Sequence, residues 1–158
     1  MKKFLKIIFI SLLIVIGIYA FLGLTSKEEY EPVVTPEPTL EIEKDGSYTT
    51  KEDVSLYLIT YGKLPKNFVT KKEAREMGWK AGKGNLQKVC KGCSIGGDVF
   101  TNSQKVLPRK KGRVYYECDI NYYGGYRGKE RLIFSNDGLI YYTDDHYRSF
   151  ELLYGEEE

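Results

Sequence analysis

The chain has 158 residues, a length that suits one domain preceded by a leader. Its formal net charge of +2 hides an uneven distribution, because the segment from Gly46 to Tyr154 holds 19 basic and 12 acidic residues. This excess of seven positive charges suits a polyanionic partner such as RNA, DNA or anionic lipid, although a solvated lysine-rich surface explains it equally well. One histidine and three cysteines are too few, and too poorly spaced, for a zinc site. The chain also has no internal repeat and no nucleotide-binding glycine loop.

Residues 1–25 have the layout of an export signal. The basic segment 1–6 precedes a charge-free apolar run from Ile7 to Leu24. This run is long for a signal peptide and close to the length that spans a bilayer, and no clear cleavage site follows it. A cleaved signal peptide and a retained membrane anchor both remain open, and contact with a membrane is expected only if the segment is retained. Either way, the rest of the chain is expected outside the cytoplasm, secreted or tethered to the outer face of the membrane.

Residues 26–46 are predicted to form an acidic, proline-containing linker. The segment has no hydrophobic period and cannot bury enough apolar surface to fold. The folded domain is then expected to comprise residues 47–158.

Short helices are predicted at the start of this domain. From Thr50 to Gly62, an N-capping threonine, apolar residues at helical spacing and a glycine C-cap follow one another. From Thr70 to Gly78, the pattern starts with a capping box. Residues 85–89 can form a third, very short helix.

Strands are predicted after Cys93. Five segments rich in β-forming residues are separated by short turns: 94–100, 113–120, 131–134, 139–142 and 149–153. The Asn-Asp-Gly sequence at 136–138 is a strong hairpin turn. Helices followed by strands predict an α+β fold, in which short N-terminal helices pack on a twisted antiparallel β-sheet.

Four side chains of complementary chemistry come from this predicted sheet. Glu117 lies mid-strand and shares a face with Asp119, because side chains alternate along a strand. Arg127 and Arg131 are four residues apart, and His146 follows the next hairpin. A carboxylate base, an imidazolium acid and two phosphate-binding guanidiniums suit metal-free attack on a phosphodiester. A lone histidine at a strand end is usually an ordinary surface residue, so this hypothesis depends on all four residues together.

Six short stretches match the sequences of a known family. They occur in the same order as in that family and at nearly the same spacing: residues 61–65, 78–79, 83–86, 94–98, 119–122 and 143–147. Across residues 54–153 the chain resembles the barnase family of secreted microbial ribonucleases, which cleave RNA after guanosine. The resemblance implies the fold of that family, an endoribonuclease activity on RNA, and no cofactor or metal.

The resemblance also implies catalytic roles. Glu117 matches the general base that takes the proton from the ribose 2′-hydroxyl, and His146 matches the general acid that protonates the departing 5′-oxygen. The two roles then reverse to hydrolyse the 2′,3′-cyclic phosphate. Arg127, Arg131 and Lys71 match the residues that bind the phosphate, although Lys71 lies beside Lys72 and a plain surface position is its alternative.

The family's guanine-recognition loop is altered here. Tyr147 matches an aromatic residue that lines the site, and the loop itself corresponds to Phe100, Thr101, Asn102, Ser103 and Gln104. Family members carry Arg-Glu where this chain has Ser103-Gln104. Gln104 is neutral and offers one acceptor oxygen where a carboxylate offers two, which costs about 1–3 kcal/mol of base discrimination. We therefore predict a weaker preference for guanine without loss of catalysis.

Five further residues concern the structure of the domain. Arg113 and Asp137 match a structural ion pair of the family. Cys90, Cys93 and Cys118 have no counterpart in barnase, and an odd count leaves one thiol over. A structural disulfide or plain buried thiols are expected, with Cys118 pointing away from Glu117 into the core, where Cys90 or Cys93 could approach it.

Three biological interpretations remain open at this level. The first is an exported, monomeric endoribonuclease with RNA as substrate and, by resemblance, an acidic inhibitor similar to barstar as partner. The second is a catalytically inactive RNA- or protein-binding module on the same fold. The third is a surface-displayed ribonuclease toxin. The intact set of Glu117, His146, Arg127 and Arg131 argues against the inactive module.

Overall fold

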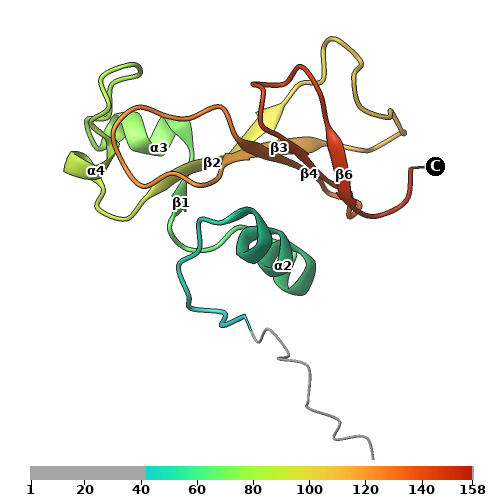
Figure 1. Cartoon of the computed structure of the whole chain (residues 1–158), viewed down its shortest axis with the longest axis horizontal. Helices are drawn as coiled ribbons and strands as arrows, with labels where there is room; N and C mark the ends of the chain where they lie inside the picture. Colours follow the sequence, from blue (N-terminus) through green and yellow to red (C-terminus); the bar gives the residue numbers. More distant parts are fainter. Residues whose placement is uncertain (1–41, 158) are drawn as a thin grey trace, which may run out of the picture. The chain divides into compact units, whose positions relative to one another are not determined.

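The computed structural model describes residues 42–157 (Figure 1). The predicted leader and most of the predicted linker lie outside these residues. In the described part of the chain, no helix is both long and apolar enough to cross a bilayer. Ile42 is buried, and its carbonyl accepts a 2.7 Å hydrogen bond from the Tyr61 hydroxyl. The Lys44 carbonyl accepts another from Tyr57, so residues 42–46 contact the first described helix.

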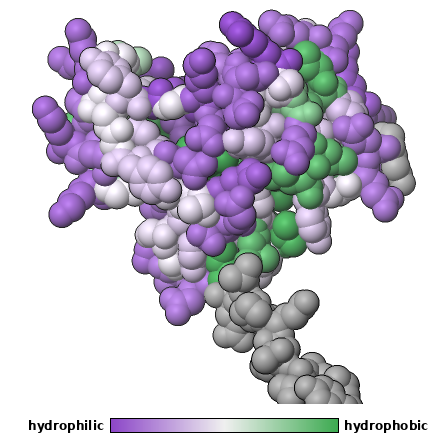
Figure 2. All heavy atoms as spheres, in the orientation of Figure 1, coloured by the Kyte–Doolittle hydropathy of each residue, from purple (hydrophilic) through white to green (hydrophobic). Residues whose placement is uncertain are grey.

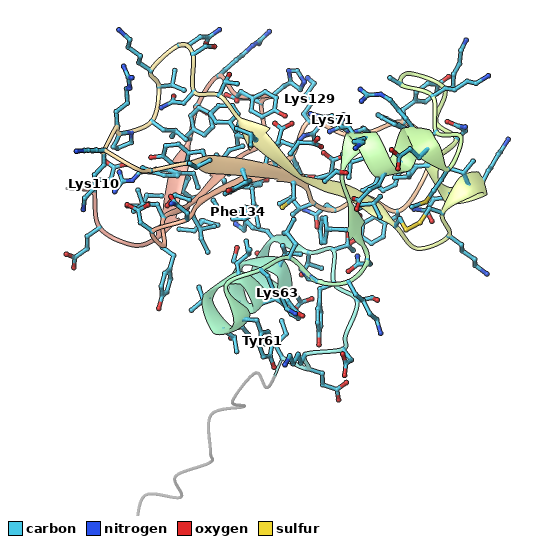
Figure 3. The ribbon with its side chains drawn as sticks, turned by 180° about the vertical axis from the view of Figure 1, so that it is seen from behind. Tyr61, Lys63, Lys71, Lys110, Lys129 and Phe134 are labelled. Atoms are coloured by element: carbon cyan, nitrogen blue, oxygen red, sulfur yellow. A yellow bond between two sulfur atoms is a disulfide. The ribbon has the colours of Figure 1, made fainter. Side chains whose placement is uncertain are left out.

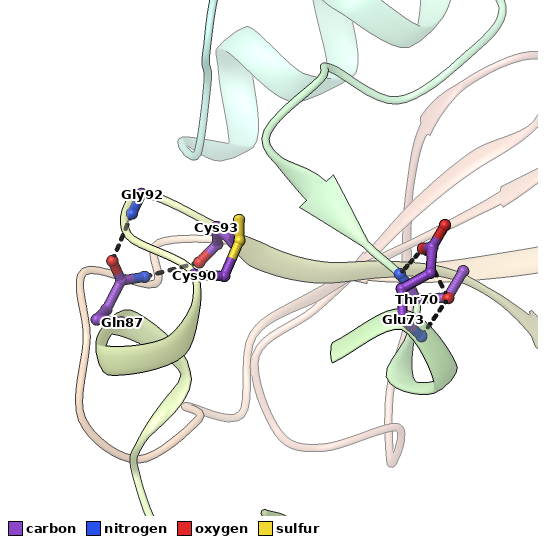
Figure 4. Close-up of a disulfide and its surroundings, with 6 residues drawn as sticks. All are labelled: Thr70, Glu73, Gln87, Cys90, Gly92 and Cys93. Atoms are coloured by element: carbon purple, nitrogen blue, oxygen red, sulfur yellow. Dashed lines mark hydrogen bonds between the residues drawn. A yellow bond between two sulfur atoms is a disulfide. The ribbon is translucent and has the colours of Figure 1, made fainter. Parts of the chain in front are cut away.

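The helices begin and end where the local signals predict. Helix α2 spans Lys51–Tyr61, with the Thr50 side chain accepting from the Asp53 N–H and Gly62 ending the helix at φ 64°. Helix α3 spans Lys71–Glu76 and starts with the predicted capping box, in which Thr70 and Glu73 each accept from the backbone N–H of the other (Figure 4). The third helix, α4, is the single turn Leu86–Val89.

Within the described residues, six strands form one sheet in the order β1-β2-β3-β4-β5-β6. Their bounds are β1 Phe68–Val69, β2 Ser94–Phe100, β3 Tyr115–Asp119, β4 Arg131–Ser135, β5 Ile140–Thr143 and β6 Glu151–Tyr154. The five predicted strands are all present, and β2 to β6 pair antiparallel. The two-residue β1 was not predicted, because a strand so short shows no alternation. It pairs parallel with β2, so the sheet is mixed and not purely antiparallel.

The two faces of the sheet carry different kinds of side chain. Helix α2 covers one face (Figure 1), where Val54 and Leu58 pack against side chains from β3, β4 and β5: Cys118, Leu132 and Ile140. Phe134 also packs against this cluster, and it lies on the α2 side of the sheet in Figure 3, whereas Lys71 lies on the other side. The other face carries Glu117 and Asp119, as the alternation along β3 predicts.

Three apolar clusters support this arrangement. Beside the α2 cluster, Leu107, Tyr115, Ile133, Leu139 and Tyr141 form a core on the opposite face. A third cluster, made of Ala74, Trp79, Leu86, Ile95 and Tyr122, joins α3 and α4 to the end of the sheet. Much of the surface in Figure 2 is hydrophilic, and its hydrophobic patch lies between α2 and β6. There, Leu58, Ile59, Phe134, Ile140 and Tyr154 line a groove.

The cysteines settle an alternative that the sequence left open. Cys90 and Cys93 form a disulfide with their Cα atoms 5.5 Å apart (Figure 4). Cys118 is a free thiol, buried in the α2 cluster, and burial raises its pKa. The expectation that Cys90 or Cys93 could approach Cys118 is therefore wrong, whereas the prediction that Cys118 points into the core is confirmed. The loop between the bridged cysteines is held by Gln87, which donates to the Cys93 carbonyl and accepts from the Gly92 N–H, each at 2.7 Å.

Candidate active site

Glu117 occupies the middle of β3, between Asp98 of β2 and Ile133 of β4. Its side chain is mostly buried, and both carboxylate oxygens have partners. Lys71 Nζ forms an ion pair with Oε1, and the Tyr147 hydroxyl donates to Oε2 at 2.7 Å. The carboxylate is thus fixed in place by one cation and one neutral donor.

These contacts set the charge of the pair. Burial alone raises the pKa of Glu117, but the hydrogen bonds from Lys71 and Tyr147 outweigh burial and bring the pKa below its usual value. Glu117 is therefore ionised at neutral pH and able to accept a proton. Burial, and then the bond to Glu117, raise the pKa of Tyr147 to about 12, so its hydroxyl keeps its proton and acts as the donor.

Lys71 reaches Glu117 because α3 is attached to the sheet. Lys71 is the first residue of α3, and its N–H donates to Oδ2 of Asp98 on β2 at 2.9 Å. Asp98 and Glu117 are register partners on neighbouring strands, so this bond brings the start of α3 to the face of the sheet that carries Glu117. Thr70 directly precedes Lys71 and caps the helix, which sets the direction in which the lysine leaves the backbone.

Asp119 holds both predicted phosphate-binding arginines. It lies two residues after Glu117 on the same face of β3, and its side chain is 3% exposed. Arg127 donates through Nε and Nη2 to its two oxygens at 2.5 and 2.7 Å, and Arg131 Nε lies 2.8 Å from Oδ1. Arg131 Nε also donates to the Tyr147 hydroxyl at 3.2 Å. In the sequence, Asp119 shared a face with Glu117 and began one of the six matching stretches, but no role was assigned to it there.

His146 lies in the turn that follows β5. His146 and Tyr147 both adopt left-handed backbone conformations, with φ 60° and 69°. Asp145 stabilises this turn, because its carboxylate accepts from the Thr143 hydroxyl at 2.9 Å and from the Arg148 N–H at 2.8 Å. Backbone strain of this kind is concentrated at functional sites. The exposed imidazole packs edge-on against the Tyr147 ring, with centroids 4.8 Å apart.

A pocket of about 460 Å³ connects the histidine with the arginines. Its lining includes His146, Arg127 and Arg131. Sequence reasoning missed three other members of this wall: Trp79, Lys129 and Arg148. Figure 3 places Lys129, like Lys71, on the side of the sheet away from α2. We call this cavity the phosphate pocket, because cationic side chains converge on it. Glu117 is connected to it through Tyr147, which contacts His146, Arg131 and Glu117.

The predicted recognition loop borders a smaller pocket of about 160 Å³. Phe100, Thr101, Asn102, Ser103 and Gln104 line it together with Val106 and Tyr147. Phe100 stacks on the Tyr147 ring, with centroids 5.7 Å apart and planes at 21°. We call this cavity the base pocket, because Tyr147 joins it to the phosphate pocket and its aromatic wall suits a planar ring.

Within the recognition loop, Asn102 stabilises the loop itself. Its side-chain amide donates to the Leu107 carbonyl at 2.8 Å and accepts from the Leu107 N–H at 3.1 Å. This leaves the exposed Thr101, Ser103 and Gln104 as loop side chains available to a ligand. Outside the site, Arg113 forms the ion pair expected with Asp137, with Nη2 2.8 Å from Oδ2.

A buried carboxylate, joined through a tyrosine to a pocket of cations and a histidine, is the set of groups expected of an enzyme that acts on phosphodiester bonds. The sequence model of the ribonuclease family matches residues 51–154. The chain belongs to this family, of the barnase-like microbial type, and it is an endoribonuclease that acts on RNA.

Individual ribonucleases are similar to this chain over most of its length. A ribonuclease of Heyndrickxia coagulans is 52% identical over 101 residues, which cover 64% of this chain and 93% of the relative. A ribonuclease of Bacillus intermedius is 45% identical over 132 residues, covering 84% and 81% of the two chains. One of Bacillus pumilus is 40% identical over 160 aligned positions, covering 95% and 98%.

Proposed function

We propose that this endoribonuclease cleaves single-stranded RNA by transesterification to a 2′,3′-cyclic phosphate, which it then hydrolyses. The observation that carries the proposal is the fixed, ionised Glu117 joined through Tyr147 to the pocket that holds His146 and the arginines. A base and an acid that contact the same tyrosine fit an in-line displacement, in which one oxygen attacks phosphorus as another departs.

In the first step, Glu117 accepts the proton of the ribose 2′-hydroxyl, and the resulting oxygen forms a bond to phosphorus. His146 donates a proton to the departing 5′-oxygen as its bond to phosphorus breaks. A nucleophile of this kind restricts the substrate to RNA. In the second step the roles reverse: His146 takes a proton from water, and Glu117 returns one to the 2′-oxygen as the ring opens.

The surrounding cations stabilise the charge that develops on the phosphate. Arg127 and Arg131 present guanidiniums whose orientation is set in advance by Asp119, so little reorganisation is needed during the reaction. Lys71 adds a third cation beside Glu117. These groups supply the positive charge that a metal ion provides in other nucleases, so we expect the reaction to proceed in the presence of a chelator.

Base preference is proposed to be for guanine, but weak. The base pocket presents the aromatic side chains of Phe100 and Tyr147 to a purine, and Gln104 lines it. An amide can accept one hydrogen bond from the guanine edge where a carboxylate accepts two, and it adds no charge. The enzyme is therefore expected to cleave after guanosine by preference, with measurable cleavage after other bases.

We propose that the enzyme acts outside the cytoplasm. The apolar run in residues 1–25 supports export, and the following linker would separate the domain from a membrane if that run were retained. Mass spectrometry of the protein recovered from the culture medium and from the membrane fraction distinguishes the two forms. Recovery of intact protein from the cytoplasm alone would contradict export.

The reaction is tested with the full-length protein and short RNAs of defined sequence in EDTA. Products ending in 2′,3′-cyclic phosphate, followed later by 3′-phosphate, are the expected result, and the nucleotide before each cut reports the base preference. Activity that requires a divalent ion, or products with 5′-phosphate ends, would overturn the mechanism. An identically prepared His146→Ala protein controls for contaminating nucleases.

A further inference from the structure

A third pocket, of about 370 Å³, lies beside the recognition loop and is lined by basic side chains. Its walls include Lys105, Arg109, Lys110 and Arg113, and we call it the basic pocket. From Val99 to Tyr116 the chain contains five basic residues and no acidic one. Figure 3 shows Lys110 at the end of the sheet farthest from α3, well away from Lys71 and Lys129. The positive charge here is therefore separate from that of the phosphate pocket.

One cation in the wall of the basic pocket, Arg113, is buried and fixed in place by Asp137. The Arg113 side chain is 3% exposed; its Nε and Nη2 bind Asp137, but its Nη1 has no hydrogen-bond partner among the described residues. The nearby Tyr115 hydroxyl donates to the Pro108 carbonyl. Because Nη1 is enclosed by the protein, Arg113 contributes positive charge to the wall of the pocket, and direct contact with an anion is left to the exposed Lys105 and Arg109.

The position of the basic pocket indicates which anion it binds. Phe100, Thr101, Asn102 and Ser103 line both the basic pocket and the base pocket. Tyr147 in turn lines the base pocket and contacts His146. The three pockets therefore follow one another in the order phosphate pocket, base pocket, basic pocket.

An RNA strand has the same order of groups. The scissile phosphate is attached to the 3′-oxygen of the recognised nucleoside, and the preceding phosphate leaves from its 5′-oxygen, on the other side. We propose that the basic pocket binds backbone phosphates of the RNA upstream, on the 5′ side, of the cleaved bond. This proposal rests on the proposed function, because that function places the scissile phosphate near His146.

The recognition is expected to be independent of sequence. Lys105 and Arg109 are exposed and can approach a phosphate, and ammonium and guanidinium groups bind phosphate through charge-assisted hydrogen bonds. Such contacts position a nucleic acid without reading its bases, and they weaken as salt rises. Substrates extended on the 5′ side should therefore be cleaved more efficiently than a dinucleotide, with a larger advantage at low salt.

The test compares two substrates with the full-length protein. One is guanylyl-3′,5′-uridine, and the other has the same G–U step preceded by three uridines. The variant is Lys105→Ser/Arg109→Ser, and the matched control is Lys63→Ser/Lys66→Ser. The control removes the same charge from exposed positions after α2, and Figure 3 shows Lys63 on the α2 side of the sheet.

We expect the ratio of kcat/KM for the extended substrate to kcat/KM for the dinucleotide to fall about 3- to 10-fold in the first variant at low salt, and to stay at the wild-type value in the control. The salt slope of log kcat/KM for the extended substrate should also decrease by about 0.7 for each phosphate group that the variant no longer binds. An unchanged ratio in the first variant would overturn the proposal, and so would an equal fall in both variants, because the effect would then be one of overall charge.

A binding measurement separates this proposal from the proposed function. The extended oligonucleotide with 2′-deoxyguanosine at the cleavage position cannot be cleaved by attack of a 2′-hydroxyl, and its affinity is measured by fluorescence anisotropy. An affinity that rises with 5′ extension in the wild type, but not in Lys105→Ser/Arg109→Ser, supports the basic pocket even if the cleavage chemistry is wrong. No gain from 5′ extension in the wild type would refute the pocket even if RNA is cleaved as proposed.

Discussion

The hydroxyl of Tyr147 donates a hydrogen bond of 2.7 Å to Oε2 of Glu117. The same hydroxyl accepts from Arg131, and the ring lies edge-on to His146 and stacked on Phe100. Tyr147 therefore connects the proposed catalytic base, the proposed acid and the base pocket through one side chain. Its left-handed backbone conformation is part of the turn that allows these contacts.

Replacing Tyr147 by phenylalanine should move the pH profile. The bond from Tyr147 lowers the pKa of Glu117, so its loss raises that pKa, and the acidic limb of kcat/KM moves to higher pH. One neutral hydrogen bond contributes about 1 kcal/mol, so kcat/KM at neutral pH should fall by no more than about tenfold. Tyr123→Phe, at a residue 76% exposed, should leave the profile in place. An acidic limb that does not move in Tyr147→Phe would mean that the limb does not report Glu117.

Neighbouring lysines offer a matched pair of variants. Lys71→Ala removes the cation beside Glu117, whereas Lys72→Ala removes one that follows it in α3. We expect kcat/KM to fall about 10- to 100-fold in Lys71→Ala and less than twofold in Lys72→Ala. Equal effects of the two substitutions on steady-state cleavage would show that Lys71 acts only through overall charge.

The Lys71→Ala variant also has an expected pH dependence of stability. Because the folded pKa of Glu117 lies below its ordinary 4.5, ionised Glu117 stabilises the fold at neutral pH. This contribution is lost as pH falls through the folded pKa. The difference in unfolding free energy between wild type and Lys71→Ala, measured in urea, should therefore shrink as pH is lowered from about 6 to about 3. A difference that grows over this range would contradict the assignment.

The acid and the base are tested directly by Glu117→Gln and His146→Ala. General acid–base catalysis contributes about 10²- to 10⁴-fold to each step, so both variants should lose at least that much in kcat. His146 is exposed and Glu117 lies at the edge of the core, so circular dichroism and the unfolding midpoint should show that both variants remain folded. Glu52→Gln on α2 is the control for a surface carboxylate. Wild-type turnover in a folded variant would remove that residue from its assigned role.

Asp119→Asn is expected to damage stability and activity together. Asp119 and Arg131 are each 3% exposed, and removing one partner of a buried ion pair costs about 3–5 kcal/mol. The exposed pair Lys51–Glu52, with 3.7 Å between Lys51 Nζ and Glu52 Oε1, should contribute less than about 1 kcal/mol, so Glu52→Gln should change little. Urea unfolding measures both. A loss below about 1 kcal/mol in Asp119→Asn would show that the two arginines do not depend on it.

Gln104→Glu should sharpen base selection. A carboxylate restores a second acceptor oxygen and a charge at the edge of the base pocket, and one such hydrogen bond contributes about 1–3 kcal/mol. The ratio of cleavage after guanosine to cleavage after adenosine should rise about 5- to 100-fold. Gln87→Glu is the control, because it adds the same charge at the disulfide loop, outside the base pocket, and should leave this ratio unchanged. A ratio unchanged by Gln104→Glu would mean that other groups read the base.

Much of the fold was predictable because its signals are local. The capping box at Thr70 and the glycine after Tyr61 limit their helices through neighbouring atoms. Alternation along β3 correctly separated Glu117 from Cys118. Strand β1 was not predicted, because two residues are too few to show the alternation of a strand. The pairing of Cys90 with Cys93 remained open because both a local and a distant partner were available to each thiol.

The sequence by itself determined the helices, five of the six described strands and the family, and it supplied the candidate residues for the chemistry, because caps, alternation and matching stretches are properties of neighbouring residues. Only the tertiary structure decided that Asp119 orients both arginines, that Lys71 reaches Glu117, and that Tyr147 joins the two pockets. These contacts connect residues up to 46 positions apart. Their distances depend on the register of the sheet and on the bond from Lys71 to Asp98, which no local pattern of residues encodes.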